Sequence, residues 1–166
     1  MAAGEIAVLF VCLGNICRSP TAHGVFEQLV LEQGLDRHIR IDSAGTGDWH
    51  LGKQPDSRTI EAGQQRGYDL RHLRARQVSA VDFELFDYIL AMDDKNLSNL
   101  QLLQPDHFNG TLSLFLPYGQ GSLDEVPDPY SGGAEGFEQV LDMVEQAAQG
   151  LLRHLREDVL NDTASS

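Results

Sequence analysis

Cysteine is scarce in this chain of 166 residues, and its two cysteines, Cys12 and Cys17, lie in one short segment near the N-terminus. Two neighbouring cysteines do not make a disulfide framework. No other cysteine can complete a thiolate metal site, and the six histidines are scattered along the sequence. We therefore expect neither a disulfide scaffold nor a bound metal, and a reducing, cytoplasmic setting is the default expectation.

Basic residues and long apolar runs are also lacking. Lys and Arg number 12 against 25 Asp and Glu, and the resulting net charge of −13 argues against a nucleic acid or an anionic membrane as a partner. No apolar run approaches the ~20 residues of a membrane-spanning helix, and residues 1–5 lack the basic start of a signal peptide. We expect no membrane insertion, and any anion-binding site in this acidic chain would depend on local dipoles and individual arginines.

The sequence does contain a regular alternation of strand and helix patterns. Strands are predicted over 6–11, 38–42, 86–91 and 112–116, and helices from 19–20 to about Gly34, over 55–66, over 94–104 and over 137–155. A long loop is expected over 117–133. This alternation predicts an α/β fold with a doubly wound parallel sheet covered on both faces. The length favours a single domain over 1–166, with a core over about 6–157 and a short flexible tail.

The most informative segment is residues 8–20, VLFVCLGNICRSP. Its apolar start predicts a strand buried on both faces, and Ser19 followed by proline predicts a helix with Ser19 as the N-cap. Gly14 and Asn15 in the intervening loop both tolerate a left-handed backbone. Loop N–H groups and a helix N-terminus together favour an anion, and Arg18, separated by five residues from the cysteine at position 12, could donate paired hydrogen bonds to a phosphate.

Such a site would also favour a thiolate, because helix N-termini and nearby cations lower cysteine pKa values from about 8.5 to roughly 3.5–7.5. Cys12 is therefore interpreted as a nucleophile beneath a bound phosphate. The Cys-x5-Arg spacing alone is equally compatible with a buried structural cysteine, and the flanking strand, glycine and helix start favour chemistry. A nucleotide-binding loop is not favoured, because its Gly-Lys-Ser/Thr ending is missing.

Residues 11–20, VCLGNICRSP, resemble the signature of the low-molecular-weight protein tyrosine phosphatases, and Asp128-Pro129-Tyr130 resembles the second motif of that family. The resemblance extends from about Ile6 to Leu155. It implies a four-stranded parallel sheet in the order 2-1-3-4 and hydrolysis of phosphotyrosine and aryl phosphate monoesters through a cysteinyl-phosphate. It also implies phosphotyrosine proteins as substrates, no cofactor, and inhibition by phosphate and vanadate.

The resemblance assigns a role to each candidate residue. Cys12 is the nucleophile, Arg18 and the backbone from Leu13 through Gly14, Asn15, Ile16 and Cys17 bind the phosphate, Ser19 stabilises the departing thiolate, and Asp128 is the general acid and then base. Asn15, Ser43 and His72 form a supporting polar network. Leu13, Ile16, Trp49 and Tyr130 line the substrate slot, and Cys17 protects an oxidised Cys12 as its disulfide partner.

Taken without the resemblance, several of these residues have simpler interpretations. Asp128 would be a turn residue before a proline, His72 a solvated loop residue, Cys17 a small apolar side chain, and Trp49 either a pocket rim or a lid on the core. If Asp128 is not the acid, Asp93 and Asp124 are the next candidates.

Two other functions compete with the phosphatase. An arsenate reductase of similar fold is the alternative enzyme, but such enzymes usually carry further cysteines downstream, and this chain has none after Cys17. A phosphate-binding module without turnover is disfavoured by the joint presence of Cys12, Arg18 and Asp128. Ser131 stands where the family often has a second tyrosine, so regulation through that tyrosine is not implied.

Overall fold

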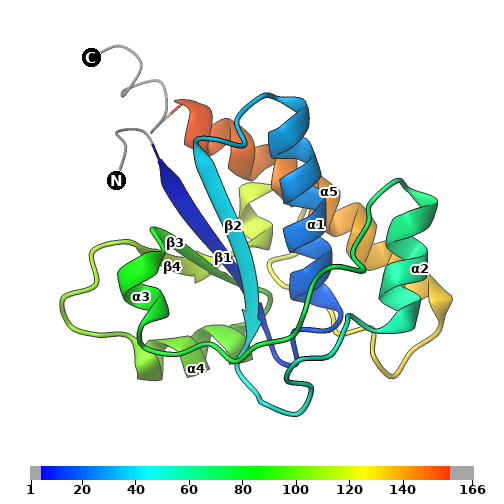
Figure 1. Cartoon of the computed structure of the whole chain (residues 1–166), viewed down its shortest axis with the longest axis horizontal. Helices are drawn as coiled ribbons and strands as arrows, with labels where there is room; N and C mark the ends of the chain where they lie inside the picture. Colours follow the sequence, from blue (N-terminus) through cyan, green and yellow to red (C-terminus); the bar gives the residue numbers. More distant parts are fainter. Residues whose placement is uncertain (1–4, 158–166) are drawn as a thin grey trace.

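The computed structural model describes residues 5–157, and the predicted tail over 161–166 lies outside them. One parallel sheet contains the four strands in the order β2-β1-β3-β4, so the predicted architecture and strand order are confirmed (Figure 1). The strands are β1 (Ile6–Cys12), β2 (Ile39–Gly45), β3 (Tyr88–Ala91) and β4 (Thr111–Leu114). The helices are α1 (Arg18–Glu32), α2 (Ser57–Gln65), α3 (Asp82–Leu85), α4 (Asp94–Leu103), α5 (Ala134–Leu155) and the short 3-10 turn η1 (Leu116–Tyr118).

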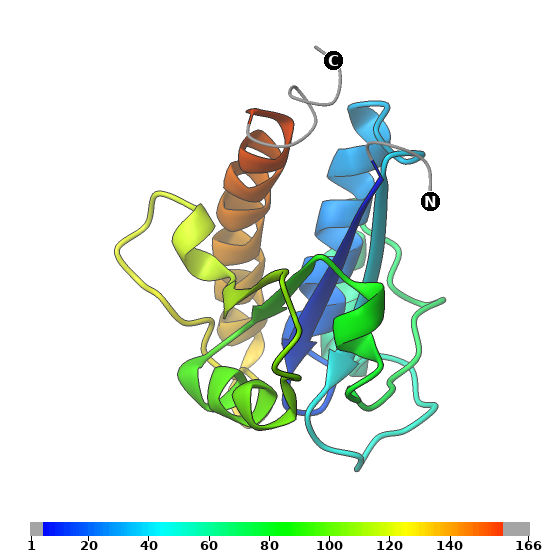
Figure 2. The ribbon, with the colours of Figure 1, turned by 90° about the vertical axis from the view of Figure 1, so that its left-hand side faces the viewer.

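The sheet separates two hydrophobic clusters, because successive side chains of β1 point to opposite faces. Phe10 lies on the face covered by α1 and α5, where its ring makes edge contacts with Phe26 and Phe115. Leu9 and Val11 lie on the other face, in the cluster that includes Phe83 and Leu100 of α3 and α4. Figures 1 and 2 show these helices on opposite sides of the sheet. Every residue of β1 is buried, as its unbroken apolar sequence predicts.

Strand β2 is longer than its composition predicts. The second strand was predicted over 38–42, but Ser43, Ala44 and Gly45 also belong to it and pair in parallel register with Phe10, Val11 and Cys12 of β1. Ladder pairing with a buried strand therefore outweighs the weak strand propensity of serine and glycine. The four-residue helix α3 was not predicted at all.

The strand order places a binding site at one edge of the sheet. β2 and β3 both pair with β1, and the order reverses between β1 and β3. Ligands of open α/β sheets bind beyond the carboxyl ends of the strands at such a switch point. The segment after Cys12 lies there.

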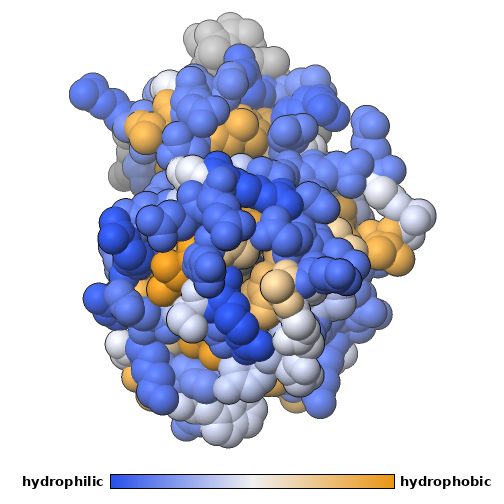
Figure 3. Space-filling model, turned by 90° about the vertical axis from the view of Figure 1, so that its right-hand side faces the viewer, coloured by the Kyte–Doolittle hydropathy of each residue, from blue (hydrophilic) through white to orange (hydrophobic). Residues whose placement is uncertain are grey.

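The remaining surface offers little apolar area on the side of α2. On the face shown in Figure 3, the described residues are mainly hydrophilic, and the hydrophobic ones form small separate patches. Within residues 5–157, no helix combines the length and the apolar character needed to cross a membrane.

Candidate active site

The loop from Leu13 to Cys17 connects the end of β1 to the start of α1. Asn15 adopts a left-handed backbone with φ 56°, the one non-glycine residue with positive φ among those the structure describes. This conformation turns its backbone N–H toward Cys12, and the Asn15 nitrogen lies 3.3 Å from Cys12 Sγ. The sulfur is buried at the base of the loop.

Ser19 is not the N-cap of α1, contrary to the sequence prediction. Cys17 occupies that position, and α1 has no side-chain cap hydrogen bond within the described part of the chain. The Ser19 hydroxyl instead lies 3.0 Å from Cys12 Sγ and accepts a hydrogen bond from Asn15 Nδ2 at 2.8 Å. The hydroxyl is thus directed at the sulfur, and the first-turn N–H groups of α1 are left for an anion.

Arg18 is buried, and two distant segments orient its guanidinium. Nη1 donates to Asp93 Oδ2 at 2.7 Å and to the Val126 carbonyl at 2.9 Å. Nη2 lies 3.9 Å from Asp128 Oδ2. Asp93 also caps α4 by accepting from the Asn96 N–H. Asp93, an alternative acid from the sequence, is therefore occupied on both carboxylate oxygens.

A cavity of about 180 Å³ opens above the loop. Trp49 and Tyr130 are 65 % and 51 % exposed and stand at its rim. Asp128 is half-exposed, and its Oδ1 accepts from the Tyr130 N–H at 3.1 Å. The lining residues are Cys12, Leu13, Gly14, Ile16, Cys17, Arg18, Trp49, His50, Asp128 and Tyr130. The cavity brings together the predicted nucleophile, arginine, acid and slot residues.

His50 and Arg58 belong to this region and were not predicted. A Cβ on Gly14 would lie 3.0 Å from the His50 ring, so His50 packs directly over the loop. Arg58 of α2 donates to the Tyr130 carbonyl at 2.7 Å and places its guanidinium 5.6 Å from the Tyr130 ring centroid. In the sequence, only the position of His50 next to Trp49 could have indicated its place at the site. No sequence feature indicated Arg58.

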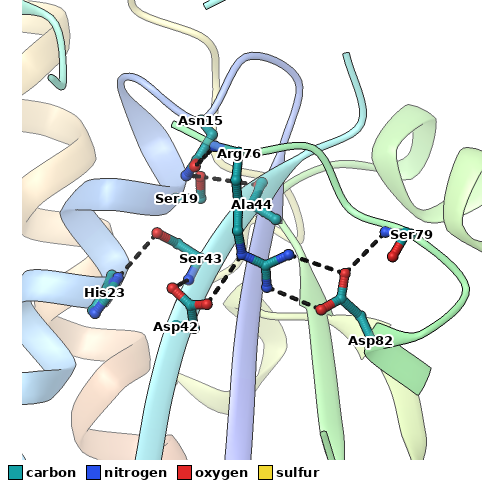
Figure 4. Close-up of polar contacts among 9 residues, drawn as sticks. All are labelled: Asn15, Ser19, His23, Asp42, Ser43, Ala44, Arg76, Ser79 and Asp82. Atoms are coloured by element: carbon teal, nitrogen blue, oxygen red, sulfur yellow. Dashed lines mark hydrogen bonds and ion pairs between the residues drawn. The ribbon is translucent and has the colours of Figure 1, made fainter. Parts of the chain in front are cut away.

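The predicted network of Asn15, Ser43 and His72 is not formed. Asn15 Oδ1 accepts instead from the Arg76 backbone N–H at 3.0 Å, and Ser43 Oγ lies 3.0 Å from His23 Nδ1 (Figure 4). His72 is exposed, with Nε2 3.5 Å from a carboxylate oxygen of Glu27 on α1.

The assignment of His72 is wrong because of the local turn. The Leu73 N–H donates to the Leu70 carbonyl, and both leucines are buried, which leaves His72 facing outward. Among the described residues of this segment, Arg76 is the one whose backbone binds the loop, through Asn15.

The pKa values of Cys17 and Glu27 depart from their ordinary values. Burial raises the pKa of the Cys17 thiol to about 12. The His23 ring, whose Nε2 lies 3.6 Å from Glu27 Oε2, lowers the pKa of that carboxyl, and His72 acts in the same direction. Among residues 5–157, no group of three or more His, Cys, Asp or Glu side chains is arranged to bind a metal.

The comparisons with known proteins all give tyrosine phosphatases. The model of the family described as low molecular weight phosphotyrosine protein phosphatase matches residues 7–161. A protein of that name from Schizosaccharomyces pombe is 48% identical over 135 residues, covering 80% of this chain and 86% of its own length. A low molecular weight protein-tyrosine-phosphatase of Bacillus subtilis is 40% identical over 154 residues, covering 92% and 97%. The crystal structure of a protein tyrosine phosphatase from Entamoeba histolytica superposes with a TM-score of 0.88 at 39% identity, covering 92% and 98%.

Proposed function

Because the chain belongs to the low molecular weight phosphotyrosine protein phosphatase family and is a phosphotyrosine hydrolase, we propose that Cys12 is the nucleophile of this reaction. The observation that carries the proposal is the environment of its sulfur. Cys12 Sγ lies at the base of the cavity, 3.3 Å from the Asn15 nitrogen and 3.0 Å from Ser19 Oγ. Both groups can donate to a thiolate, and the reactive form of a cysteine is the thiolate.

In the first step, the Cys12 thiolate attacks phosphorus, so that an S–P bond forms as the bond from phosphorus to the tyrosine oxygen breaks. Asp128 gives its proton to the departing oxygen. Backbone N–H groups of the loop and the Arg18 guanidinium bind the three non-bridging oxygens, where they stabilise the charge that shifts in the transition state. Support for this role of Arg18 comes from its Nη1 contacts, which fix the guanidinium and leave Nη2 on the side of Asp128.

In the second step, a water attacks the cysteinyl-phosphate and Asp128, now a carboxylate, takes its proton. The S–P bond breaks, inorganic phosphate forms, and the Ser19 hydroxyl donates to the returning thiolate. The product occupies the same oxyanion site as the substrate, so we propose competitive inhibition by phosphate. Vanadate should inhibit similarly, as a five-coordinate mimic of the transition state.

The substrate class follows from the depth of the cavity. Leu13 and Ile16 line its wall and Trp49 and Tyr130 its rim, which suits an aromatic ring between the surface and the buried sulfur. We propose phosphotyrosine proteins as substrates and expect phosphoserine peptides to react far more slowly, because their side chain is too short. A cytoplasmic setting is part of the proposal, supported by the two free thiols. The arsenate reductase alternative is not favoured, since every relative described above is a phosphatase.

The test concerns Asp128, because a general acid matters most when the leaving group is poor. Tyrosine leaves as an oxygen with pKa about 10, so the Asp128→Ala variant should form the phosphoenzyme from phosphotyrosine roughly 10²–10⁴-fold more slowly. With p-nitrophenyl phosphate, whose leaving group is more acidic, the loss should be smaller. Single-turnover rates are the measurement, since a slow second step would mask the difference. Equal losses would make Asp128 a positioning residue, and no loss would move the acid to Asp124.

We also propose that Cys17 captures an oxidised Cys12. Peroxide converts the Cys12 thiolate to a sulfenic acid, and the Cys17 thiol then displaces hydroxide from it, which forms a disulfide and water. Because burial raises the pKa of Cys17 to about 12, this second step should be slow at neutral pH. Dithiothreitol should restore activity to peroxide-treated wild type and much less to Cys17→Ser. Equal recovery would make Cys17 a packing residue only.

A further inference from the structure

Arg76 contacts the catalytic loop through its backbone, although it lies outside both motifs. Its N–H donates to Asn15 Oδ1 at 3.0 Å, and its carbonyl accepts from the Gly45 N–H at 2.8 Å. The next residue forms an isolated parallel bridge with Gly45, which is itself paired with Cys12. The backbone at position 76 therefore lies between the end of β2 and the loop that carries the reactive sulfur.

The side chain of Arg76 is bound at its other end by two carboxylates. Nη1 and Nη2 donate to the two oxygens of Asp82 at 3.1 and 3.0 Å, and Nε donates to Asp42 Oδ2 at 3.1 Å. Figure 4 shows the guanidinium between these carboxylates, which come from α3 and β2. Asp82 is 5 % exposed and also accepts from the Ser79 N–H. A planar guanidinium bound by both fork nitrogens has little freedom to move.

The loop has a particular need for such a contact. Asn15 is in the left-handed region, which a residue with a Cβ occupies only when its surroundings enforce it. Two side-chain hydrogen bonds enforce it here: Nδ2 donates to Ser19 Oγ, and Oδ1 accepts from Arg76. The consequence of this conformation is the 3.3 Å approach of the Asn15 N–H to Cys12 Sγ.

We propose that Arg76, anchored by Asp82 and Asp42, is a positioning residue for phosphotyrosine hydrolysis: it keeps Asn15 in the conformation that directs its N–H at the Cys12 thiolate. This inference rests on the proposed role of Cys12 as nucleophile. It predicts that the ion pair of Arg76 with Asp82 affects thiolate formation and oxyanion binding, in addition to any effect on stability. A purely structural ion pair would change only the stability.

The experiment compares Arg76→Gln with wild type in three measurements. We expect kcat for p-nitrophenyl phosphate to fall about tenfold, the factor expected for losing one well-aligned hydrogen bond. The inhibition constant of inorganic phosphate should rise by a similar factor. The pH midpoint for alkylation of Cys12 by iodoacetate should move upward, because a misplaced N–H no longer stabilises the thiolate.

Arg71→Gln is the matched control. Arg71 binds Asp69, two positions before it, through Nε and Nη2, but this exposed pair makes no contact with the catalytic loop. The control should leave all three measurements unchanged. If Arg76→Gln fails to fold, Asp42→Asn serves in its place, because Asp42 is partly exposed and only one hydrogen bond to Arg76 is lost.

A double-mutant comparison separates positioning from stability. In an Asn15→Gly background the acceptor oxygen is absent, so adding Arg76→Gln should lower the thermal unfolding midpoint again but not kcat or phosphate binding. If Arg76→Gln lowers kcat by the same factor in both backgrounds, or leaves the alkylation midpoint of otherwise wild-type protein unchanged, the inference is overturned. Retained turnover in Cys12→Ser would instead overturn the proposed nucleophile, so the two failures are distinguishable.

Discussion

Gly45→Ala should impair catalysis although Gly45 does not line the cavity. Gly45 ends β2, and a Cβ added there would lie 2.7 Å from the Leu13 carbonyl oxygen and 3.1 Å from the Asn15 nitrogen. These are backbone atoms, so no side-chain rotation relieves the contact. Restoring an ordinary separation of 3.4 Å from the carbonyl requires the loop to move by about 0.7 Å. The movement would shift the loop N–H groups that we propose to bind the phosphate oxygens.

The expected magnitudes follow from that movement. Misplacing catalytic groups by about 1 Å costs roughly 10²-fold in rate, so we expect kcat/KM to fall on the order of 10–10²-fold. Overpacking of this kind should also lower the free energy of unfolding by about 1–3 kcal/mol, which corresponds to roughly 2–4 °C in Tm per kcal/mol for a chain of this size. The inhibition constant of phosphate should rise in parallel with the loss in rate, because the same N–H groups bind both ligands.

Gly133→Ala is the control for this prediction. Gly133 precedes α5 with φ −87°, and nothing lies within 4 Å of an added Cβ. Steady-state kinetics on p-nitrophenyl phosphate and thermal unfolding should be measured for both variants. Turnover of Gly45→Ala within twofold of wild type, with phosphate inhibition unchanged, would refute the reasoning that packing at Gly45 sets the loop position.

Three further predictions concern single contacts. Arg18→Lys should lose at least 10²-fold in kcat/KM for p-nitrophenyl phosphate, because one ammonium cannot keep the Nη1 contacts and also bind an oxyanion. Gly150→Ala should lower the free energy of unfolding by about 1–3 kcal/mol without changing kcat at 25 °C, since its Cβ would overlap the Tyr118 carbonyl oxygen. The contact with His23 lowers the pKa of Glu27 in the folded state, so the stability that this contact contributes is complete above the unfolded pKa of about 4.3 and is lost as pH falls through the folded pKa. Urea unfolding should therefore find Glu27→Gln less stable than wild type near neutral pH and equal to it in strong acid.

The central strand β1 could be predicted because its sequence is apolar without interruption. The segment from Ile6 to Cys12 has no polar side chain, which is typical of a strand covered on both faces, and all seven residues are buried. Helix α5 was predicted from its apolar stripe for the same reason. The strand order could not be obtained from these patterns, and it was supplied by the family resemblance.

Other predictions failed or were missed because the contacts depend on how the loop folds and on which segments the fold brings together. Serine before proline is a good N-cap signal, yet Ser19 Oγ turns to Cys12 and Asn15 because the loop folds back over β1. Arg58 contacts Tyr130 across 72 positions of sequence, a pairing that helical periodicity cannot indicate. The local propensities of the residues cannot predict such contacts.

The prediction for His72 failed for a different reason, which is that a backbone group takes the place of the expected side chain. The family resemblance assigns a histidine side chain to the polar network around Asn15, and His72 was matched to that position. Asn15 Oδ1 in fact receives a backbone N–H, and any residue other than proline supplies one. The hydrogen bond itself therefore does not require an arginine at position 76. The arginine side chain instead fixes the position of this backbone, because Asp82 and Asp42 bind it. The residues that position the loop are thus one arginine and two aspartates, and none of the three belongs to the loop motif.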